Sequence, residues 1–167
     1  NLDQKNLLLM MCLVSTMVMI GCDKDDDIHV SKVPEAVVET LQAKFPNAEF
    51  VEWEMYKDYY IADFWLSGAD TQVWISKNAI WRMTETDLGV NLAKLPSAVQ
   101  TAFQSSKYAD WRVDDLDKYE RPDRTFYLIE IEKKGERDRD LYYAEDGTLL
   151  KDEQDRENNE VTPDTQF

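Results

Sequence analysis

Two short segments of this chain resemble each other, and their repetition constrains the fold more than any other feature of the sequence. The segment VPEAV at residues 33–37 recurs as LPSAV at residues 95–99, with the prolines 62 positions apart (34 and 96). After each proline, apolar residues follow at intervals of three and four, which places them on one face of a helix. The sequence therefore predicts two copies of one unit, at residues 31–90 and 91–152, each opening with a helix.

Strand-like segments rich in aromatic and β-branched residues follow each predicted helix. The eight expected strands are 50–56, 59–66, 71–76 and 79–84 in the first unit and 111–119, 125–133, 137–144 and 148–152 in the second. Asn78-Ala79 stands where the second unit has Asp146-Gly147, a pair typical of two-residue hairpin turns. The predicted fold class is therefore α+β: a tandem repeat of two α-β-β-β-β units forming one antiparallel sheet of about eight strands, with helices packed on one face. The alternative is a single α+β domain whose halves are similar by chance.

Residues 1–21 have the pattern of a lipoprotein signal peptide. Their apolar run, 7–20, is shorter than the roughly 20 residues that a spanning helix needs and fits the core of a signal peptide. The segment MIGC at residues 19–22 resembles a bacterial lipobox, so we expect Cys22 to be lipidated and the protein to be anchored to the outer membrane, in the periplasm or at the surface. An uncleaved anchor and an ordinary cleaved signal are the alternatives.

Acidic segments flank the predicted repeats. Residues 22–30 begin with the run CDKDDD, which we expect to form a solvated, disordered tether. This run serves equally as a plain spacer or as the acidic stretch found after the lipidated cysteine in some surface-exported Bacteroidetes lipoproteins; it lacks the spaced ligands and glycine of a calcium loop. Residues 153–167 are polar and acidic, and we expect a disordered tail there.

Composition excludes several functions. Thirty-four acidic residues against 19 basic ones give a net charge of −15, which disfavours nucleic-acid binding and electrostatic docking on anionic lipid, so we expect membrane contact through the lipid anchor only. His29 is the single histidine, and both cysteines, Cys12 and Cys22, precede the predicted repeats. A histidine-based triad, a histidine-rich zinc site and a disulfide within the repeats are therefore not expected, and no cofactor is predicted.

Carboxylates are the remaining candidates for chemistry. Glu130 and Glu132 alternate along one predicted strand and therefore share a face. They could act as the paired carboxylates of a glycosidase, but Lys133 and Arg137 nearby favour ion pairs on a solvated sheet face, so we predict a protein that is not an enzyme. Together with Asp63 they form the weaker alternative, an acidic face that binds a cation or a small ligand.

Four aromatic residues are candidates for a binding surface: Trp65, Trp74, Trp81 and Tyr142. An antiparallel sheet with helices on one face leaves its other face open to water or to a partner. Large aromatics on that open face would anchor a protein or peptide. The alternative is that these side chains complete a core between the two units.

The paired VPxAV and LPxAV segments, FPNA at residues 45–48, Trp53, YxAxF at residues 60–64 and Asp146-Gly147 resemble the PepSY-like periplasmic lipoproteins of Bacteroidetes. The resemblance implies a fold similar to β-lactamase-inhibitor proteins and brings no catalytic residues with it. The second unit departs from the pattern, with Lys107-Tyr108 in place of the Phe-Pro pair. A link to inhibition rests on fold analogy alone.

These observations support three hypotheses. The favoured one is a non-enzymatic, lipid-anchored module that binds, or inhibits, an unidentified envelope protein or peptide through the open sheet face. The second is an envelope sensor or carrier that binds a small ligand or cation on the acidic face. The third is a structural protein that self-associates.

Overall fold

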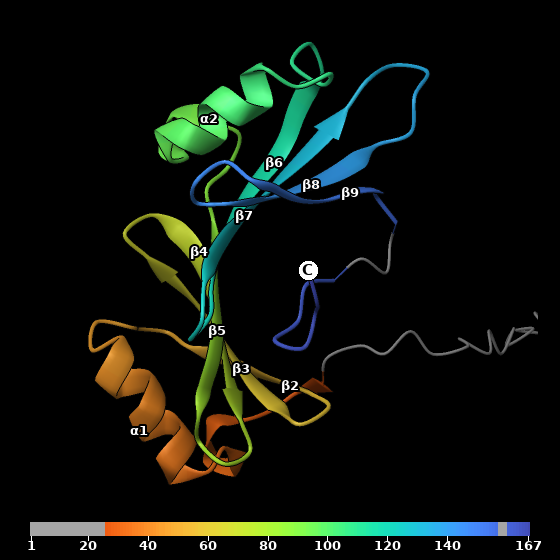
Figure 1. The fold of residues 1–167 in the computed structure, drawn as a ribbon. Coiled ribbons are helices and arrows are strands. Elements are labelled where there is room, and N and C mark those ends of the chain that lie inside the picture. The colour runs from red at the N-terminus through yellow and green to blue at the C-terminus, as the bar shows by residue number, and fades with distance from the viewer. Residues whose placement is uncertain (1–25, 157–159) are drawn as a thin grey trace, which may run out of the picture.

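The computed structural model describes residues 26–156 and 160–167, in which nine strands form one antiparallel sheet (Figure 1). Each strand pairs with the next one along the chain, so the order in the sheet is the order in the sequence. The strands are β1 Asp26–Asp27, β2 Glu52–Tyr56, β3 Tyr59–Leu66, β4 Ala69–Ser76, β5 Trp81–Asp87, β6 Arg112–Glu120, β7 Thr125–Glu132, β8 Arg139–Ala144 and β9 Leu149–Gln154. The predicted α+β fold class is confirmed, and β2–β9 are the eight expected strands.

Two α-helices lie on the same side of the sheet, α1 (Glu35–Lys44) against the first four-stranded unit and α2 (Ser97–Gln104) against the second (Figure 1). Pro34 and Pro96 stand at the position before each helix, where a proline costs no hydrogen bond. The 3₁₀ turns Val30–Lys32 and Leu92–Lys94 precede the two helices. Both units therefore enter their helix in the same way.

The helix face of the sheet carries two apolar clusters, one beneath each helix. Val37 and Leu41 of α1 pack on strands β2–β4, and Val99 and Phe103 of α2 pack on β6–β8. All four side chains are at most 2% exposed, and each fully buried side chain of this size contributes about 1.5–3 kcal/mol to the free energy of unfolding. The spacing of three and four residues thus positions each helix over its own half of the sheet.

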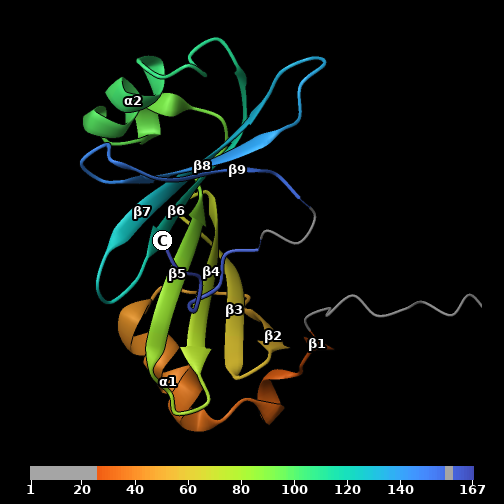
Figure 2. The same cartoon turned by 45° about the vertical axis from the view of Figure 1, so that its right-hand side comes forward.

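The opposite face, here called the concave face, curves around the C-terminal segment (Figures 1 and 2). It carries a third cluster, which joins the two units and includes no helix residue. Its buried members are Tyr59, Ile61, Trp74, Met83, Tyr119, Phe126, Leu128, Tyr142 and Val161. The units are also joined directly, because β5 pairs with β6.

The predicted disordered tail is wrong for the part of it that the structure describes. Residues 153–154 extend β9, and residues 160–167 pack on the concave face. Phe167 lies with its ring centroid 4.7 Å from that of Phe126 and 5.0 Å from that of Tyr142. The guanidinium of Arg121 donates to the carbonyl oxygens of Thr162 and Thr165. The polar composition predicts disorder, but a few contacts, those of Val161, Phe167 and Arg121 among them, hold this segment on the apolar cluster.

The predicted disordered tether is also wrong at its end. Asp26–Asp27 form β1 at the edge of the sheet, and the N–H of Ile28 donates to the carbonyl of Trp53 at 2.9 Å. Backbone pairing with an exposed strand edge does not depend on side-chain hydrophobicity, which explains why the acidic composition missed it. The predicted signal peptide, Cys22 and the start of the tether lie outside the described residues.

Candidate functional site

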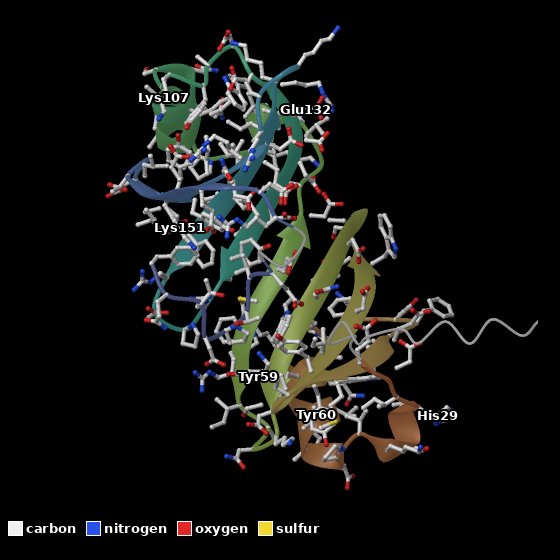
Figure 3. All side chains as sticks on the ribbon, turned by 90° about the vertical axis from the view of Figure 1, so that its right-hand side faces the viewer. His29, Tyr59, Tyr60, Lys107, Glu132 and Lys151 are labelled. Atoms are coloured by element: carbon white, nitrogen blue, oxygen red, sulfur yellow. The ribbon has the colours of Figure 1, made fainter. Side chains whose placement is uncertain are left out.

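A hollow of about 640 Å³ on the concave face gathers carboxylates from four neighbouring strands and from the segment after β9. Figure 3 looks onto this side of the sheet. The acidic side chains that line this acidic hollow are Glu85, Asp87, Asp115, Asp117, Glu130, Asp140, Asp155 and Glu160. Arg156 is the one basic residue among the lining residues.

Strand register explains why residues from both units converge here. Asp87 of β5 is directly opposite Asp117 of β6, and Asp115 of β6 is opposite Glu130 of β7. Glu130 is in turn opposite Asp140 of β8. Directly opposed residues on one sheet face have Cβ atoms about 4.5–5.5 Å apart, and like charges at that distance repel. The antiparallel pairing therefore builds an acidic row across three strand boundaries.

Asp117 has the most unfavourable environment in the acidic hollow. Its side chain is only 8% exposed, and it makes no hydrogen bond or ion pair with any other residue that the structure describes. Burial raises the pKa of its carboxyl to about 9, and the neighbouring charges that add to this rise are all acidic, Glu85 and Asp115 foremost. An unpaired carboxylate at this depth is costly. Asp117 therefore keeps its proton at neutral pH unless a cation enters.

Two glutamates of the hollow also have perturbed acidity. Burial raises the pKa of Glu85 to about 7, although its carboxylate accepts a hydrogen bond from the Tyr119 hydroxyl at 3.2 Å. Burial, followed by the charge of Asp140, raises the pKa of Glu130 to about 7 as well. These groups change charge close to neutral pH, so proton binding and cation binding compete in the hollow.

Three of the carboxyl groups are arranged as a metal site would need. Asp87, Asp115 and Asp117 each offer one carboxylate oxygen, and these oxygens lie within 4.8 Å of one another. An ion at the centre of such a triangle is at most about 2.8 Å from each oxygen, close to the 2.3–2.6 Å of Ca²⁺–oxygen bonds. Oxygen donors of this kind suit hard cations, with water completing the coordination.

The structure brings together only part of the predicted acidic face. Glu130 lines the acidic hollow. Asp63 lies on β3 of the same face but outside the hollow, where it accepts a hydrogen bond from Gln72, and burial followed by the charge of Asp70 raises its pKa. Glu132 is bound to Arg112 at 2.6 Å, which lowers its pKa and removes it from the group.

The four predicted aromatic residues separate in the structure. Trp74 and Tyr142 do lie on the concave face, but each is 1% exposed, as core rather than open surface. Trp81 packs on the helix-face cluster of the first unit, with the Lys44 ammonium 3.7 Å from its ring centroid. Trp65 is 70% exposed and is the one of the four that lies mostly open to solvent.

The three aspartates of the metal-like triangle, Asp87, Asp115 and Asp117, are not among the site residues predicted from the sequence. Their signal was present as Glu85-x-Asp87 and Asp115-x-Asp117, two alternating acidic pairs on strands that the fold places side by side. Alternation puts each pair on one face. That the two pairs lie next to each other follows only from the pairing of β5 with β6, which joins the two units.

Comparisons with known proteins identify relatives of the whole fold. The family model described as "Putative beta-lactamase-inhibitor-like, PepSY-like" matches residues 18–63 and 58–151. A BLIP-like protein from Bacteroides fragilis is 36% identical, with a TM-score of 0.69 over 80% of this chain and 92% of that one. A DUF2874 family protein from Bacteroides ovatus is 33% identical, with a TM-score of 0.69 over 72% of this chain and 86% of that one.

A further similar structure, from Bacteroides eggerthii, is described as a periplasmic protein; it is 29% identical, with a TM-score of 0.68 over 73% of this chain and 88% of that one. No curated protein matches the chain. Among the residues that the structure describes, neither helix is long and apolar enough to cross a bilayer.

Proposed function

The chain belongs to this PepSY-like, β-lactamase-inhibitor-like family, and on that premise we propose that it is a non-enzymatic binding protein of the cell envelope that captures a positively charged protein segment in the acidic hollow. The observation that carries the proposal is Asp117, a buried carboxyl group whose pKa is raised by burial and by the charges of Glu85 and Asp115. A lysine or arginine side chain placed among these groups would replace repulsion with charge-assisted hydrogen bonds. Without a bound cation, the repulsion between these acidic groups destabilises the folded protein.

The rim of the hollow indicates that the bound segment also carries an apolar side chain. Trp65 is 70% exposed and is directly opposite Asp70 in the sheet. The charge of Asp70 contributes to the raised pKa of Glu85, and Trp65 on β3 lies two strands away from Asp87 on β5, at one end of the acidic row. Exposed tryptophans are favoured anchors in interfaces. A basic segment with a neighbouring apolar residue would therefore contact both features, and inhibition of an envelope enzyme would be one form of such binding.

Calorimetry with peptides of equal length tests this proposal. A peptide containing lysine and leucine should bind, and the versions with lysine changed to alanine or glutamate should not. The double variant Asp87→Asn/Asp117→Asn should lose at least about tenfold in affinity, because two charge-assisted contacts disappear. Asp138→Asn, at an exposed carboxylate outside the hollow, is the matched control and should bind as the unmodified protein does. Equal binding of the alanine peptide would remove the electrostatic basis of the proposal.

A second candidate is favoured by the triangle of Asp87, Asp115 and Asp117: capture of a divalent cation. Millimolar Ca²⁺ should then raise the melting temperature, because a ligand that binds only the folded state stabilises it. The increase should disappear in Asp115→Asn and persist in Asp138→Asn. If Ca²⁺ and Mg²⁺ leave the melting temperature unchanged at pH 9, where Glu85 and Glu130 have lost their protons and Asp117 is about half ionised, the cation candidate is rejected.

Attachment to the envelope is the remaining part of the proposal. It is supported by the segment MIGC at residues 19–22 and by the description of the B. eggerthii relative as periplasmic. Cys22 would carry the acyl chains that hold the protein at the outer membrane. Mass spectrometry of the purified mature protein should find a lipid-modified Cys22, and Cys22→Ser should move the protein from the membrane fraction to the soluble one. An unmodified Cys22 in the mature protein would refute the anchor.

A further inference from the structure

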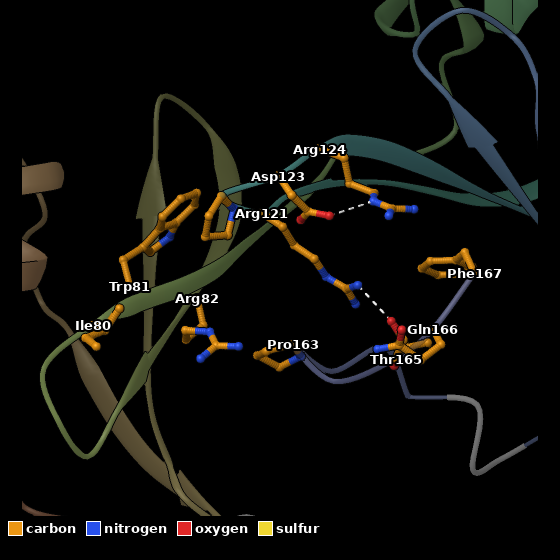
Figure 4. A pocket seen from close by; sticks show the side chains of 11 residues that line it. Ile80, Trp81, Arg82, Arg121, Asp123, Arg124, Pro163, Thr165, Gln166 and Phe167 are labelled. Carbon is orange, nitrogen blue, oxygen red and sulfur yellow. Dashed lines mark hydrogen bonds and ion pairs between the residues drawn. The ribbon is translucent and has the colours of Figure 1, made fainter.

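A second hollow has the opposite charge. It has a volume of about 410 Å³ and lies between the start of β5, the β6–β7 turn and the C-terminal segment (Figure 4). Three of its lining residues are arginines, Arg82, Arg121 and Arg124, in a chain with a net charge of −15. We call it the arginine hollow. Its less polar walls are Ile80, Trp81, Pro122, Pro163 and Phe167.

The positive charge of the arginine hollow is only partly neutralised. Arg124 pairs with Asp123 at 3.0 Å through its Nε, so its two terminal nitrogens remain available. Asp164 accepts a hydrogen bond from the Tyr59 hydroxyl at 2.9 Å. Arg82 makes no hydrogen bond or ion pair with any residue in the described part of the chain. Asp123 is the one acidic side chain among the lining residues, against three guanidinium groups.

Holding the C-terminal segment accounts for one of the three arginines. Arg121 donates to the carbonyls of Thr162 and Thr165, and its guanidinium lies 5.0 Å from the Phe126 ring centroid. Burial lowers its pKa, and the nearby charge of Arg124 lowers it further. Arg82 and Arg124 form no such bond to the segment, although both line the same hollow (Figure 4). Their convergence is therefore not explained by the fold alone.

We propose that the arginine hollow binds a small organic anion, with a carboxylate or phosphate group held by Arg82 and Arg124. Guanidinium groups offer paired N–H donors that match both kinds of oxyanion. The walls formed by Trp81 and the two prolines fit a planar or apolar body, as ligand sites commonly combine such walls with a few polar groups. The ligand is a small molecule rather than an anionic membrane. A small anion in the hollow is screened from acidic residues that lie beyond a Debye length of about 8–10 Å. A membrane would instead be repelled by the acidic residues of the whole surface that faces it.

Phenyl phosphate and benzoate are suitable probes, because they share a planar body and differ in the anionic group. Calorimetry at constant ionic strength should detect binding of at least one of them. Arg82→Gln should weaken that binding about tenfold or more, since a charge-assisted contact is lost. Arg82→Lys keeps the charge and loses the paired donors, so its affinity should lie between those of the unmodified protein and Arg82→Gln. The melting temperature of Arg82→Gln should stay near that of the unmodified protein, because Arg82 has no hydrogen bond or ion pair to lose among residues 26–156 and 160–167.

The matched control is Arg137→Gln, an exposed arginine outside the arginine hollow. It removes the same charge and should leave the affinity unchanged. An equal loss of affinity in Arg82→Gln and Arg137→Gln would show a net-charge effect and overturn the proposal. The proposal is also overturned if neither probe binds more tightly than chloride does. Because the acidic hollow is not altered in these variants, failure here leaves the proposed binding of a basic segment unaffected.

Discussion

The two faces of this sheet are built on different rules. On the helix face, each unit has its own helix over its own cluster, and the clusters share no residue. On the concave face, one aromatic cluster and one acidic hollow take residues from both units and from the C-terminal segment. Local periodicity determines the first face, and pairing between distant segments determines the second. The helix face therefore supplies stability, and the concave face carries the groups whose pairing is incomplete.

The largest expected effect concerns the helix face. Phe103→Ala should lower the free energy of unfolding by about 3–5 kcal/mol, because a ring that is 2% exposed leaves a cavity. Leu41→Ala, its counterpart beneath α1, should cost about 2–5 kcal/mol for the same reason. Urea unfolding followed by circular dichroism measures both. Two separate transitions would show that the halves unfold independently, despite the pairing of β5 with β6 and their shared aromatic cluster.

The second prediction concerns the acidic hollow and has the opposite sign. The pKa of Asp117 is raised in the folded protein to about 9, against about 3.9 in an unfolded chain. Between these values the folded state binds more protons, so stability falls as pH rises. Asp117→Asn removes that loss and should be more stable than the unmodified protein by about 2–3 kcal/mol at pH 8. The effect is smaller than the full pKa difference implies, because solvent in the open hollow screens the charge. Near pH 4 the two proteins should be nearly equal.

Urea unfolding at pH 4, 6, 8 and 9 checks this prediction. Asp138→Asn serves as the control, because it removes an exposed carboxylate and should follow the pH dependence of the unmodified protein. A variant that gains stability while losing a bound cationic segment would link the strain in the hollow to its proposed use. Parallel pH curves for Asp117→Asn and the unmodified protein would contradict the buried, unpaired state of Asp117.

The two units also differ at one equivalent turn, which gives a third prediction. The β8–β9 turn has Gly147 at φ 86°, and an added Cβ would lie 2.6 Å from the carbonyl oxygen of Ala98 in α2. The β4–β5 turn has Ala79 at φ 59°, and its carbonyl accepts a hydrogen bond from Thr40 of α1 at 2.8 Å. Both turns touch the helix of their own unit, but only the second approaches too closely for a side chain.

Gly147→Ala should therefore cost roughly 2 kcal/mol, from the contact with α2 and the left-handed backbone together. Ala79→Gly should be nearly neutral, because the relief of its left-handed strain offsets the greater freedom of glycine in the unfolded chain. Thermal unfolding of the two variants measures the difference. Equal effects would mean that the second turn is no more tightly packed than the first.

Much of the helix face could be predicted from the sequence. The repeated proline and the apolar spacing predict the two helices, and the turn residues predict the hairpins. The apolar positions are Val37, Leu41, Val99 and Phe103. These are local patterns, so each can be read without knowing the partner of any strand. The departure at Lys107-Tyr108 did not disturb the fold, since Tyr108 packs into the α2 cluster with Trp111.

The concave face could be predicted only in part. Trp65 is 70% exposed, but whether Trp74 and Tyr142 are surface or core depends on the segment that covers them. The acidic hollow required knowing that Asp87 is opposite Asp117, which are 30 positions apart in the chain and belong to different units. The composition of residues 153–167 predicts disorder, so the packing of the C-terminal segment on the aromatic cluster could not be predicted from it.

The smallest expected effect tests that cover. Phe167→Ala should lower the free energy of unfolding by about 1 kcal/mol, because the ring is only partly buried and its contacts with Phe126 and Tyr142 are aromatic pairs of modest strength. Hydrogen exchange is the more sensitive measurement. The amides of residues 161–165 should exchange faster in this variant, while those of β3 and β7 keep their protection. Gln166→Ala, at an exposed neighbour whose amide donates to the carbonyl oxygen of Asp164 at 3.0 Å, should have a smaller effect on both measurements. Unchanged exchange in Phe167→Ala would mean that the contacts of Val161, Arg121 and Asp164 hold the segment without the Phe167 ring.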